Sequence, residues 1–136
     1  QTFLGIWIRL LLQKKLIQIF GDGQQLRDFN YVDDCVDAFL MSGISDKTNG
    51  KVYNLGSNEV IGLKELAETM VSLNFGGSYE LIPFPKDREL IDIGNYYSDF
   101  SLITSELEWQ PKTSLKDGLK KTIKYYKLHS FHYWDN

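Results

Sequence analysis

Arg27 is the residue of this chain whose type and surroundings best suit chemistry on a charged ligand. It follows the turn Gly21-Asp22-Gly23 and precedes Asp33, a good N-cap residue for a helix. A planar guanidinium in that place can bind a phosphate through two parallel hydrogen bonds. It can also form a structural ion pair with Asp28 or Asp33. The residues by themselves leave both interpretations open.

The glycine turn before Arg27 does not match a dinucleotide-binding loop. Leu26 stands where that motif has its third glycine, and the local pattern predicts no helix there. A phosphate cradle needs both a close backbone approach and a helix N-terminus. We therefore expect an ordinary tight turn and no NAD bound by this chain alone.

Other reactive residue types in the chain do not form a site. His129 and His132 are three residues apart and Asp135 follows, but a metal needs a third convincing ligand on a rigid platform. We expect these three side chains to be solvated and expect no metal. Cys35 has no identifiable base near it in the sequence and is interpreted as a packed thiol. A run of lysines over 116–127 is interpreted as the solvated face of a helix.

Hydrophobic periodicity predicts the elements that position Arg27. Helices are expected over 3–11, from Asp33 or Asp34 to Gly43, over 63–71, over 101–107 and from Ser114 onward, and strands over 16–20, 52–55 and 79–82. Residues 83–99 show no period and are expected to be a long, functional loop. Alternating strands and helices predict an α/β fold with parallel pairing.

The length and composition of the chain limit the classes of protein to which it can belong. The chain has 136 residues, enough for one domain over 1–136, with 43% hydrophobic and 24% charged residues, a globular balance. The net charge of −3 gives no support to a partner that is nucleic acid or a membrane surface. No apolar run is long enough for a membrane span and no signal peptide is visible, so we expect a cytoplasmic protein. Because residue 1 is Gln, we expect a piece of a longer protein.

Five motifs, in order along the chain, resemble one enzyme family. The segment 21–34 resembles the G-x-G-x-x-x-R-D-[FY]-x-x-V-x-D pattern of extended short-chain dehydrogenases/reductases, the NAD-dependent nucleotide-sugar epimerases and dehydratases typified by UDP-glucose 4-epimerase and dTDP-glucose 4,6-dehydratase. The other four motifs are Val52-Tyr53-Asn54-Leu55-Gly56, Tyr97-Ser98-Asp99-Phe100-Ser101, Leu107-Glu108-Trp109-Gln110-Pro111 and Ser114-Leu115-Lys116-Asp117-Gly118-Leu119. The resemblance covers residues 1 to 128 and implies the small C-terminal substrate-binding domain of such an enzyme. Its fold is mixed short strands with packed helices, and residues 129–136 are expected to form a flexible tail.

The resemblance also implies a binding site for a UDP- or dTDP-sugar. Arg27 matches the arginine that holds the substrate diphosphate, and Arg88 is the candidate for the second arginine, although its spacing to the Y-x-D aspartate is offset by about one residue. The strand containing Gln18 and Phe20 matches the one whose backbone touches the base. Two further positions follow from the resemblance: Phe29 matches an aromatic residue beside the nucleotide, and Asp92 fits a carboxylate near the second arginine. At the fourth motif, Glu108 replaces the usual glycine.

The family's catalytic pair is not in this sequence. Its members use a Tyr-x-x-x-Lys pair, and none of the eight tyrosines here is followed four residues later by lysine. The resemblance therefore implies that the catalytic residues and the NAD-binding Rossmann domain lie outside these 136 residues, and that the chain alone is inactive. In the intact enzyme the sugar is oxidised at C4 by hydride transfer to NAD. The alternative is a degenerate binding or interaction module that keeps the fold without catalysis.

Overall fold

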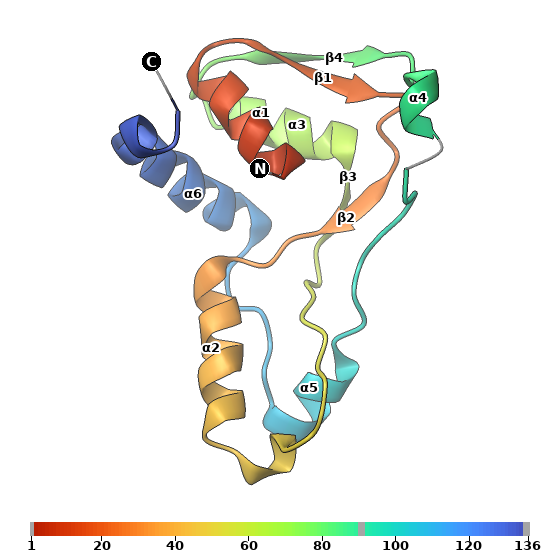
Figure 1. Ribbon diagram of the computed structural model, residues 1–136. Coiled ribbons are helices and arrows are strands. Elements are labelled where there is room, and N and C mark those ends of the chain that lie inside the picture. The colour runs from red at the N-terminus through yellow and green to blue at the C-terminus, as the bar shows by residue number, and fades with distance from the viewer. Residues whose placement is uncertain (1, 90–91, 135–136) are drawn as a thin grey trace.

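The computed structural model describes residues 2–89 and 92–134 (Figure 1). In chain order the elements are α1 (Phe3–Leu12), β1 (Leu16–Phe20), β2 (Leu26–Asp28), α2 (Val32–Gly43), η1 (Asp46–Thr48), β3 (Val60–Gly62), α3 (Leu63–Ser72), β4 (Ser78–Ile82), α4 (Lys86–Glu89), α5 (Ser101–Leu107), α6 (Leu115–His129) and η2 (Ser130–His132). The mixed α/β arrangement of short strands and helices agrees with the prediction.

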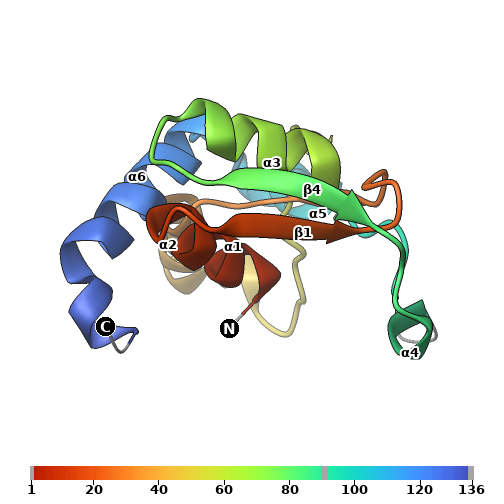
Figure 2. The same cartoon turned by 90° about the horizontal axis from the view of Figure 1, so that it is seen from above.

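The first sheet pairs β1 with β4 in parallel, as the alternation of elements predicted. The register runs from Leu16 opposite Ser78 to Phe20 opposite Ile82. Side chains alternate along β1, so that Ile17 and Ile19 are buried while Leu16 and Gln18 are exposed. Figures 1 and 2 show α1 and α3 lying beneath this two-stranded sheet, with α6 beside α1.

The main hydrophobic core lies between this sheet and the three helices. Its fully buried side chains come from α1, β1, α3 and α6, and include Leu11, Ile17, Leu66, Met70 and Ile123. The helical stripe predicted over 63–71 is the buried face of α3. Burying side chains of this size contributes about 1.5–3 kcal/mol each, which makes this core the main source of stability of the upper part of the molecule.

The second sheet was not predicted. β2 and β3 pair antiparallel, with Arg27 opposite Ile61. Each strand has three residues, too short to show a period, and β2 carries two charged residues. The prediction of a strand over 52–55 is wrong, because these residues form no β-ladder with any described part of the chain.

A smaller core holds the lower part of the molecule in Figure 1, where α2 and α5 lie side by side. Trp109 is buried between Ala38 and Ile103, and its Nε1 donates to the backbone oxygen of Asp34 at 3.0 Å. α2 begins at Val32, so the predicted N-cap aspartates lie in its first turn. The Asp34 carboxylate is buried and accepts the backbone N–H of Thr113 at 3.0 Å.

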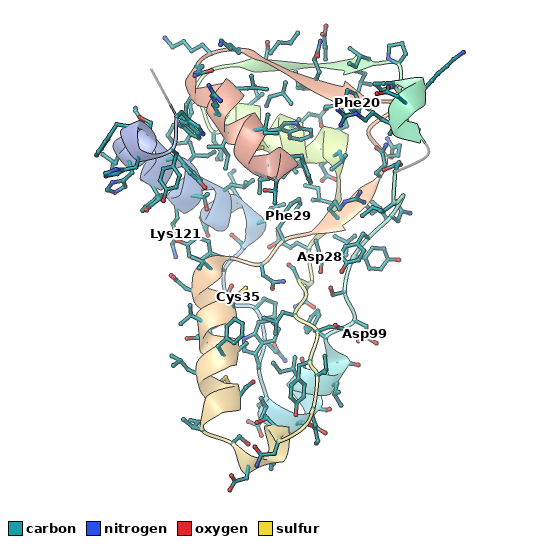
Figure 3. The ribbon with its side chains drawn as sticks, in the orientation of Figure 1. Phe20, Asp28, Phe29, Cys35, Asp99 and Lys121 are labelled. Atoms are coloured by element: carbon teal, nitrogen blue, oxygen red, sulfur yellow. The ribbon has the colours of Figure 1, made fainter. Side chains whose placement is uncertain are left out.

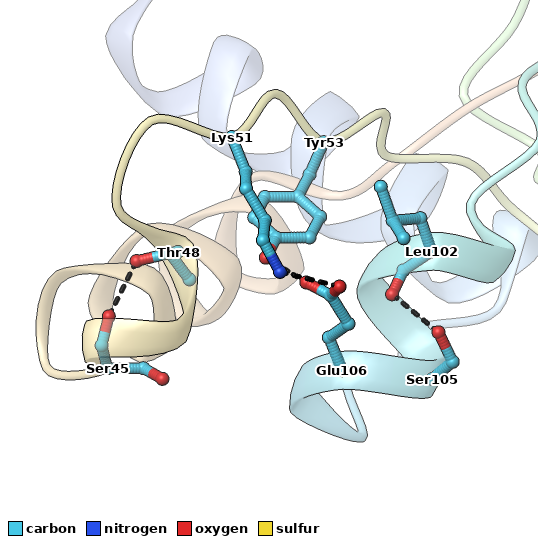
Figure 4. A network of polar contacts seen from close by, with 7 residues as sticks. All are labelled: Ser45, Thr48, Lys51, Tyr53, Leu102, Ser105 and Glu106. Carbon is cyan, nitrogen blue, oxygen red and sulfur yellow. Dashed lines mark hydrogen bonds and ion pairs between the residues drawn. The ribbon is translucent and has the colours of Figure 1, made fainter.

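A polar cluster fastens the chain after η1 to α5 (Figure 4). The Glu106 carboxylate pairs with Lys51 Nζ at 2.7 Å and accepts a hydrogen bond from the Tyr53 hydroxyl. These two donors lower the pKa of Glu106, and the hydrogen bond to Glu106 raises the pKa of Tyr53 to about 12. The bonds hold residues 51–53 in place without a β-ladder.

The last helix begins where the sequence predicted. The Ser114 hydroxyl oxygen accepts the backbone N–H of Asp117 at 3.2 Å and caps α6. The tail expected over 129–136 is described as far as residue 134. There Trp134 packs against Tyr126 with ring centroids 5.2 Å apart and joins the main core. Among the described residues, no helix is long and apolar enough to cross a membrane.

Candidate nucleotide-sugar-binding cleft

A cleft of about 520 Å³ lies between α1, β1, β2 and the loop that follows β4. Five of the six predicted site residues line it: Gln18, Phe20, Arg27, Arg88 and Asp92. These residues come from three separated parts of the sequence. The fold therefore brings together the side chains that the resemblance had grouped, and it places both arginines at one cleft.

The structure places Phe29 elsewhere. Its ring packs edge-on against Phe3, with centroids 6.2 Å apart, and contacts the main core. Phe29 directly follows β2, which ends at Asp28, and is partly buried. Figure 3 shows Phe20 beside α4 and Phe29 in the middle of the molecule, well apart.

Arg27 is held by backbone oxygens and forms no ion pair with a described carboxylate. Its Nη1 donates to the Leu26 carbonyl at 2.7 Å and to the Gly94 carbonyl. The neighbouring Asp28 uses Oδ2 to accept the backbone N–H groups of Ser57 and Ser98, each at 3.2 Å. The predicted ion pair of Arg27 with Asp28 or Asp33 is therefore absent among the described residues, and the guanidinium lines the cleft.

Arg88 and Asp92 lie on the exposed side of the cleft. Arg88 is on the single-turn helix α4, with its side chain 60% exposed and 3.8 Å from the Asp87 carboxylate. An exposed pair of that length contributes little and leaves the guanidinium available. The long loop predicted over 83–99 thus contains a short helix, and Arg88 and Asp92 of this loop line the same cleft as Arg27.

The apolar wall of the cleft was missed as a site. Phe3, Ile6, Trp7 and Leu10 of α1 line it together with Phe84, whose ring meets Phe20 edge-on at 5.6 Å. Sequence periodicity predicted that these α1 residues form a buried face. Periodicity cannot show which part of that face stays open to a cleft. Phe84 had one signal, its position between two prolines. Clefts with an apolar lining and a few placed polar groups are typical of small-molecule sites.

Two motif residues, Asp28 and Gly56, lie where the strand that carries Arg27 meets neighbouring segments. Asp28 connects β2 to Ser57 and Ser98 through the two hydrogen bonds that its carboxylate accepts. Gly56 lies where these segments meet, and a Cβ there would be 2.7 Å from Phe100 Cδ1 and 2.8 Å from the Ser98 carbonyl oxygen. The aspartate after Arg27 and the glycine of the second motif therefore hold β2 close to the segments around Ser57 and Ser98.

The glycine turn at 21–23 does not match a pyrophosphate-binding loop of the kind that holds NAD. The turn after β1 leads into β2 and not into a helix, so it offers no helix N-terminus to a pyrophosphate. The described residues also contain no group of three or more His, Cys, Asp and Glu side chains that could hold a metal. Of the three residues weighed as metal ligands, Asp135 lies outside the described residues. Burial and the nearby Asp34 raise the pKa of the Cys35 thiol, which disfavours a nucleophilic role.

Comparison with known proteins shows which protein family the chain belongs to. The sequence profile of the family described as GDP-mannose 4,6 dehydratase matches residues 5–122. The chain belongs to this family of nucleotide-sugar epimerases and dehydratases.

Its relatives carry out different reactions. The chain is 38% identical over 142 residues to the dTDP-glucose 4,6-dehydratase of Haemophilus influenzae, covering 96% of this chain and 41% of that protein. It is 31% identical over 124 residues to the UDP-N-acetyl-alpha-D-glucosaminuronate decarboxylase of Bacillus cytotoxicus, covering 89% of this chain and 38% of the relative. The chain thus spans about two fifths of the length of these curated relatives.

A solved structure agrees with the fold. The UDP-glucuronic acid 4-epimerase of Bacillus cereus, in complex with UDP-glucuronic acid and NAD, is 27% identical with a TM-score of 0.74. The match covers 90% of this chain and 38% of the epimerase. Dehydratase, decarboxylase and epimerase relatives therefore all share the part that this chain represents.

Proposed function

We propose that this chain is the C-terminal, nucleotide-diphosphate-sugar-binding part of an NAD-dependent epimerase or dehydratase. The observation that carries the proposal is the cleft, in which Arg27 and Arg88 lie beside an apolar and aromatic wall. The wall suits a base and the arginines suit a diphosphate. The ligand is a UDP- or dTDP-sugar, and the chain itself supplies binding and orientation.

Charge supports a local mode of recognition. The chain has a net charge of −3, so its overall field repels a diphosphate. The attraction of a diphosphate must therefore come from individual cationic side chains that are held at the cleft. Arg27 is fixed by two backbone carbonyls and has no carboxylate partner among the described residues, so it is available to supply that attraction.

An exposed apolar surface supports the proposed partner, the N-terminal Rossmann domain of the same enzyme. On α2 the side chains of Val32, Val36, Phe39, Leu40 and Ile44 are between 46% and 88% exposed. They recur at helical spacing and form one face, and contiguous exposed apolar faces mark interaction sites. Residues 52–55, which pair in no β-ladder with any described part of the chain, lie in the same part of the molecule (Figure 1).

The redox chemistry lies outside this chain in this proposal. The glycine turn at 21–23 leads into a strand and offers no helix N-terminus to a pyrophosphate, and the sequence has no Tyr-x-x-x-Lys pair. The cleft holds the nucleotide and diphosphate, which fixes where the sugar projects. The chain alone is expected to be catalytically inactive.

Calorimetric titration of the chain with UDP and with dTDP tests the proposal. Removing one charged hydrogen-bond partner weakens an interaction by about 1.5–3 kcal/mol, so Arg27→Ala should raise the Kd roughly 10- to 150-fold. The chain offers a matched control, because Arg9 does not line the cleft and Arg9→Ala should leave the Kd unchanged. Equal affinities for Arg27→Ala and the parent would remove Arg27 from the site.

A further inference from the structure

A short segment lies along the outer edge of β2, next to Arg27. On its inner edge β2 pairs with β3 through Arg27 and Ile61. On its outer edge the Tyr96 N–H donates to the Leu26 carbonyl at 3.0 Å, and Tyr96 forms an isolated parallel bridge with Arg27. Residues 94–96, called the strap below, thus take the place of a third strand beside β2.

The Asn95 side chain supplies the second hydrogen bond between the strap and β2. The Asn95 Oδ1 accepts the backbone N–H of Leu26 at 2.9 Å, a bond that a neighbouring strand's carbonyl would ordinarily make. Leu26 therefore has both its N–H and its carbonyl bound to the strap. Since Leu26 directly precedes Arg27, the Asn95 side chain determines where the strap lies relative to the arginine.

The strap in turn holds the guanidinium. The Gly94 carbonyl accepts a hydrogen bond from Arg27 Nη1, and the Leu26 carbonyl accepts from the same nitrogen at 2.7 Å. Gly94 has φ of +61°, a conformation that favours glycine and that turns the chain where it meets Arg27. Both recorded acceptors are on Nη1, which leaves the donors on Nε and Nη2 for a ligand in the cleft that Arg27 lines.

We propose that Asn95 is a positioning residue for the anion-binding guanidinium of Arg27. This inference rests on the proposed function of the cleft as a diphosphate site. Asn95 acts through the strap: its bond to Leu26 places the Gly94 carbonyl, and that carbonyl orients Arg27. The strap begins two residues after Asp92, so it also joins the strand carrying Arg27 to the loop that supplies the exposed side of the cleft.

A double-mutant cycle with UDP as the probe separates positioning from general structural damage. Asn95→Leu keeps the size of the side chain and removes the acceptor. The loss of one hydrogen bond should raise the Kd for UDP roughly two- to tenfold in the parent chain. In the Arg27→Ala background the same substitution should have no further effect, because the group through which it acts is gone. Asn49→Leu, at an exposed asparagine outside the cleft, is the matched control and should leave the Kd unchanged.

Amide hydrogen exchange reports on the strap without any ligand. Asn95→Leu should lower the protection of the Leu26 N–H, and Asn95→Asp, which keeps an acceptor oxygen, should retain it. Unchanged protection in Asn95→Leu overturns the inference, as does an equal loss of UDP affinity in both Arg27 backgrounds. If the parent chain binds no UDP, the proposed function fails and this role fails with it. If the parent binds and Asn95→Leu binds equally well, only the positioning role is refuted.

Discussion

Asp28→Ala removes a carboxylate that joins three segments of the chain. Asp28 is on β2, and its Oδ2 accepts N–H groups from Ser57 and Ser98, which follow β2 by 29 and 70 residues. Without the carboxylate, two partly buried N–H groups lose their acceptor. Unpaired donors of this kind are costly because they have given up water without gaining a partner.

The geometry sets the size of the effect. Hydrogen bonds to a charged acceptor contribute about 1.5–3 kcal/mol each, and long, partly exposed bonds belong at the lower end of that range. Both bonds to Asp28 are 3.2 Å long, so together they should contribute about 3 kcal/mol. Asp28→Asn keeps one acceptor oxygen and should lose about half of that. These losses are large against total stabilities of about 5–15 kcal/mol.

Urea unfolding followed by tryptophan fluorescence measures this loss. With a slope of about 2 kcal/mol per M, the midpoint of Asp28→Ala should fall by about 1.5 M. Asp22 provides a control, because among the described residues its carboxylate accepts only the Gln24 N–H, at 3.0 Å in an exposed turn. Asp22→Ala should lose less than about 1 kcal/mol. The reasoning is refuted if Asp28→Ala is no less stable than Asp22→Ala.

Three further substitutions test other parts of the fold. Gly56→Ala places a Cβ 2.7 Å from Phe100 Cδ1 and should destabilise the chain by about 1–3 kcal/mol in urea unfolding; an unchanged midpoint would contradict the tight contact. Ser114→Ala removes the cap of α6 and should lower stability by about 1 kcal/mol, seen as a lower Tm by circular dichroism, whereas an equal Tm would argue against the cap. Tyr53 should stabilise the fold fully below pH 10 and lose that contribution as the pH rises toward 12, because the hydrogen bond to Glu106 raises the phenol pKa to about 12 and favours its neutral form. The stability difference between the parent and Tyr53→Phe, measured in urea at several pH values, should therefore shrink over that interval, and a difference independent of pH would show that the bond does not form.

Local patterns in the sequence predicted the helices and the parallel pair because those elements depend on nearby residues. The apolar stripe over 63–71 became the buried face of α3, and Ser114 capped α6 as its type suggests. Local sequence patterns could not predict the pairing of β2 with β3. Strands of three residues show no period, and their stability comes from a partner far along the chain.

Residues 52–55 show the converse error. Their composition predicts a strand, but a strand needs a neighbour, and none of the described residues pairs with them in a ladder. For the site, the motif resemblance identified Arg27, whereas only the structure shows that Asp28 is occupied by backbone N–H groups and does not neutralise the arginine. The strap and the apolar wall depend on loop conformation and incomplete burial, which periodicity does not encode.

The central claim is that the cleft binds the nucleotide diphosphate. A ¹⁵N-labelled sample titrated with UDP and followed by amide chemical shifts tests it directly. The account predicts that the shifts gather on β1 and on β2 around Arg27, and that they disappear in Arg27→Ala. Shifts gathered instead on the lysine-rich face of α6, around Lys120 and Lys124, would show that UDP is attracted by exposed charge and would contradict the proposed site.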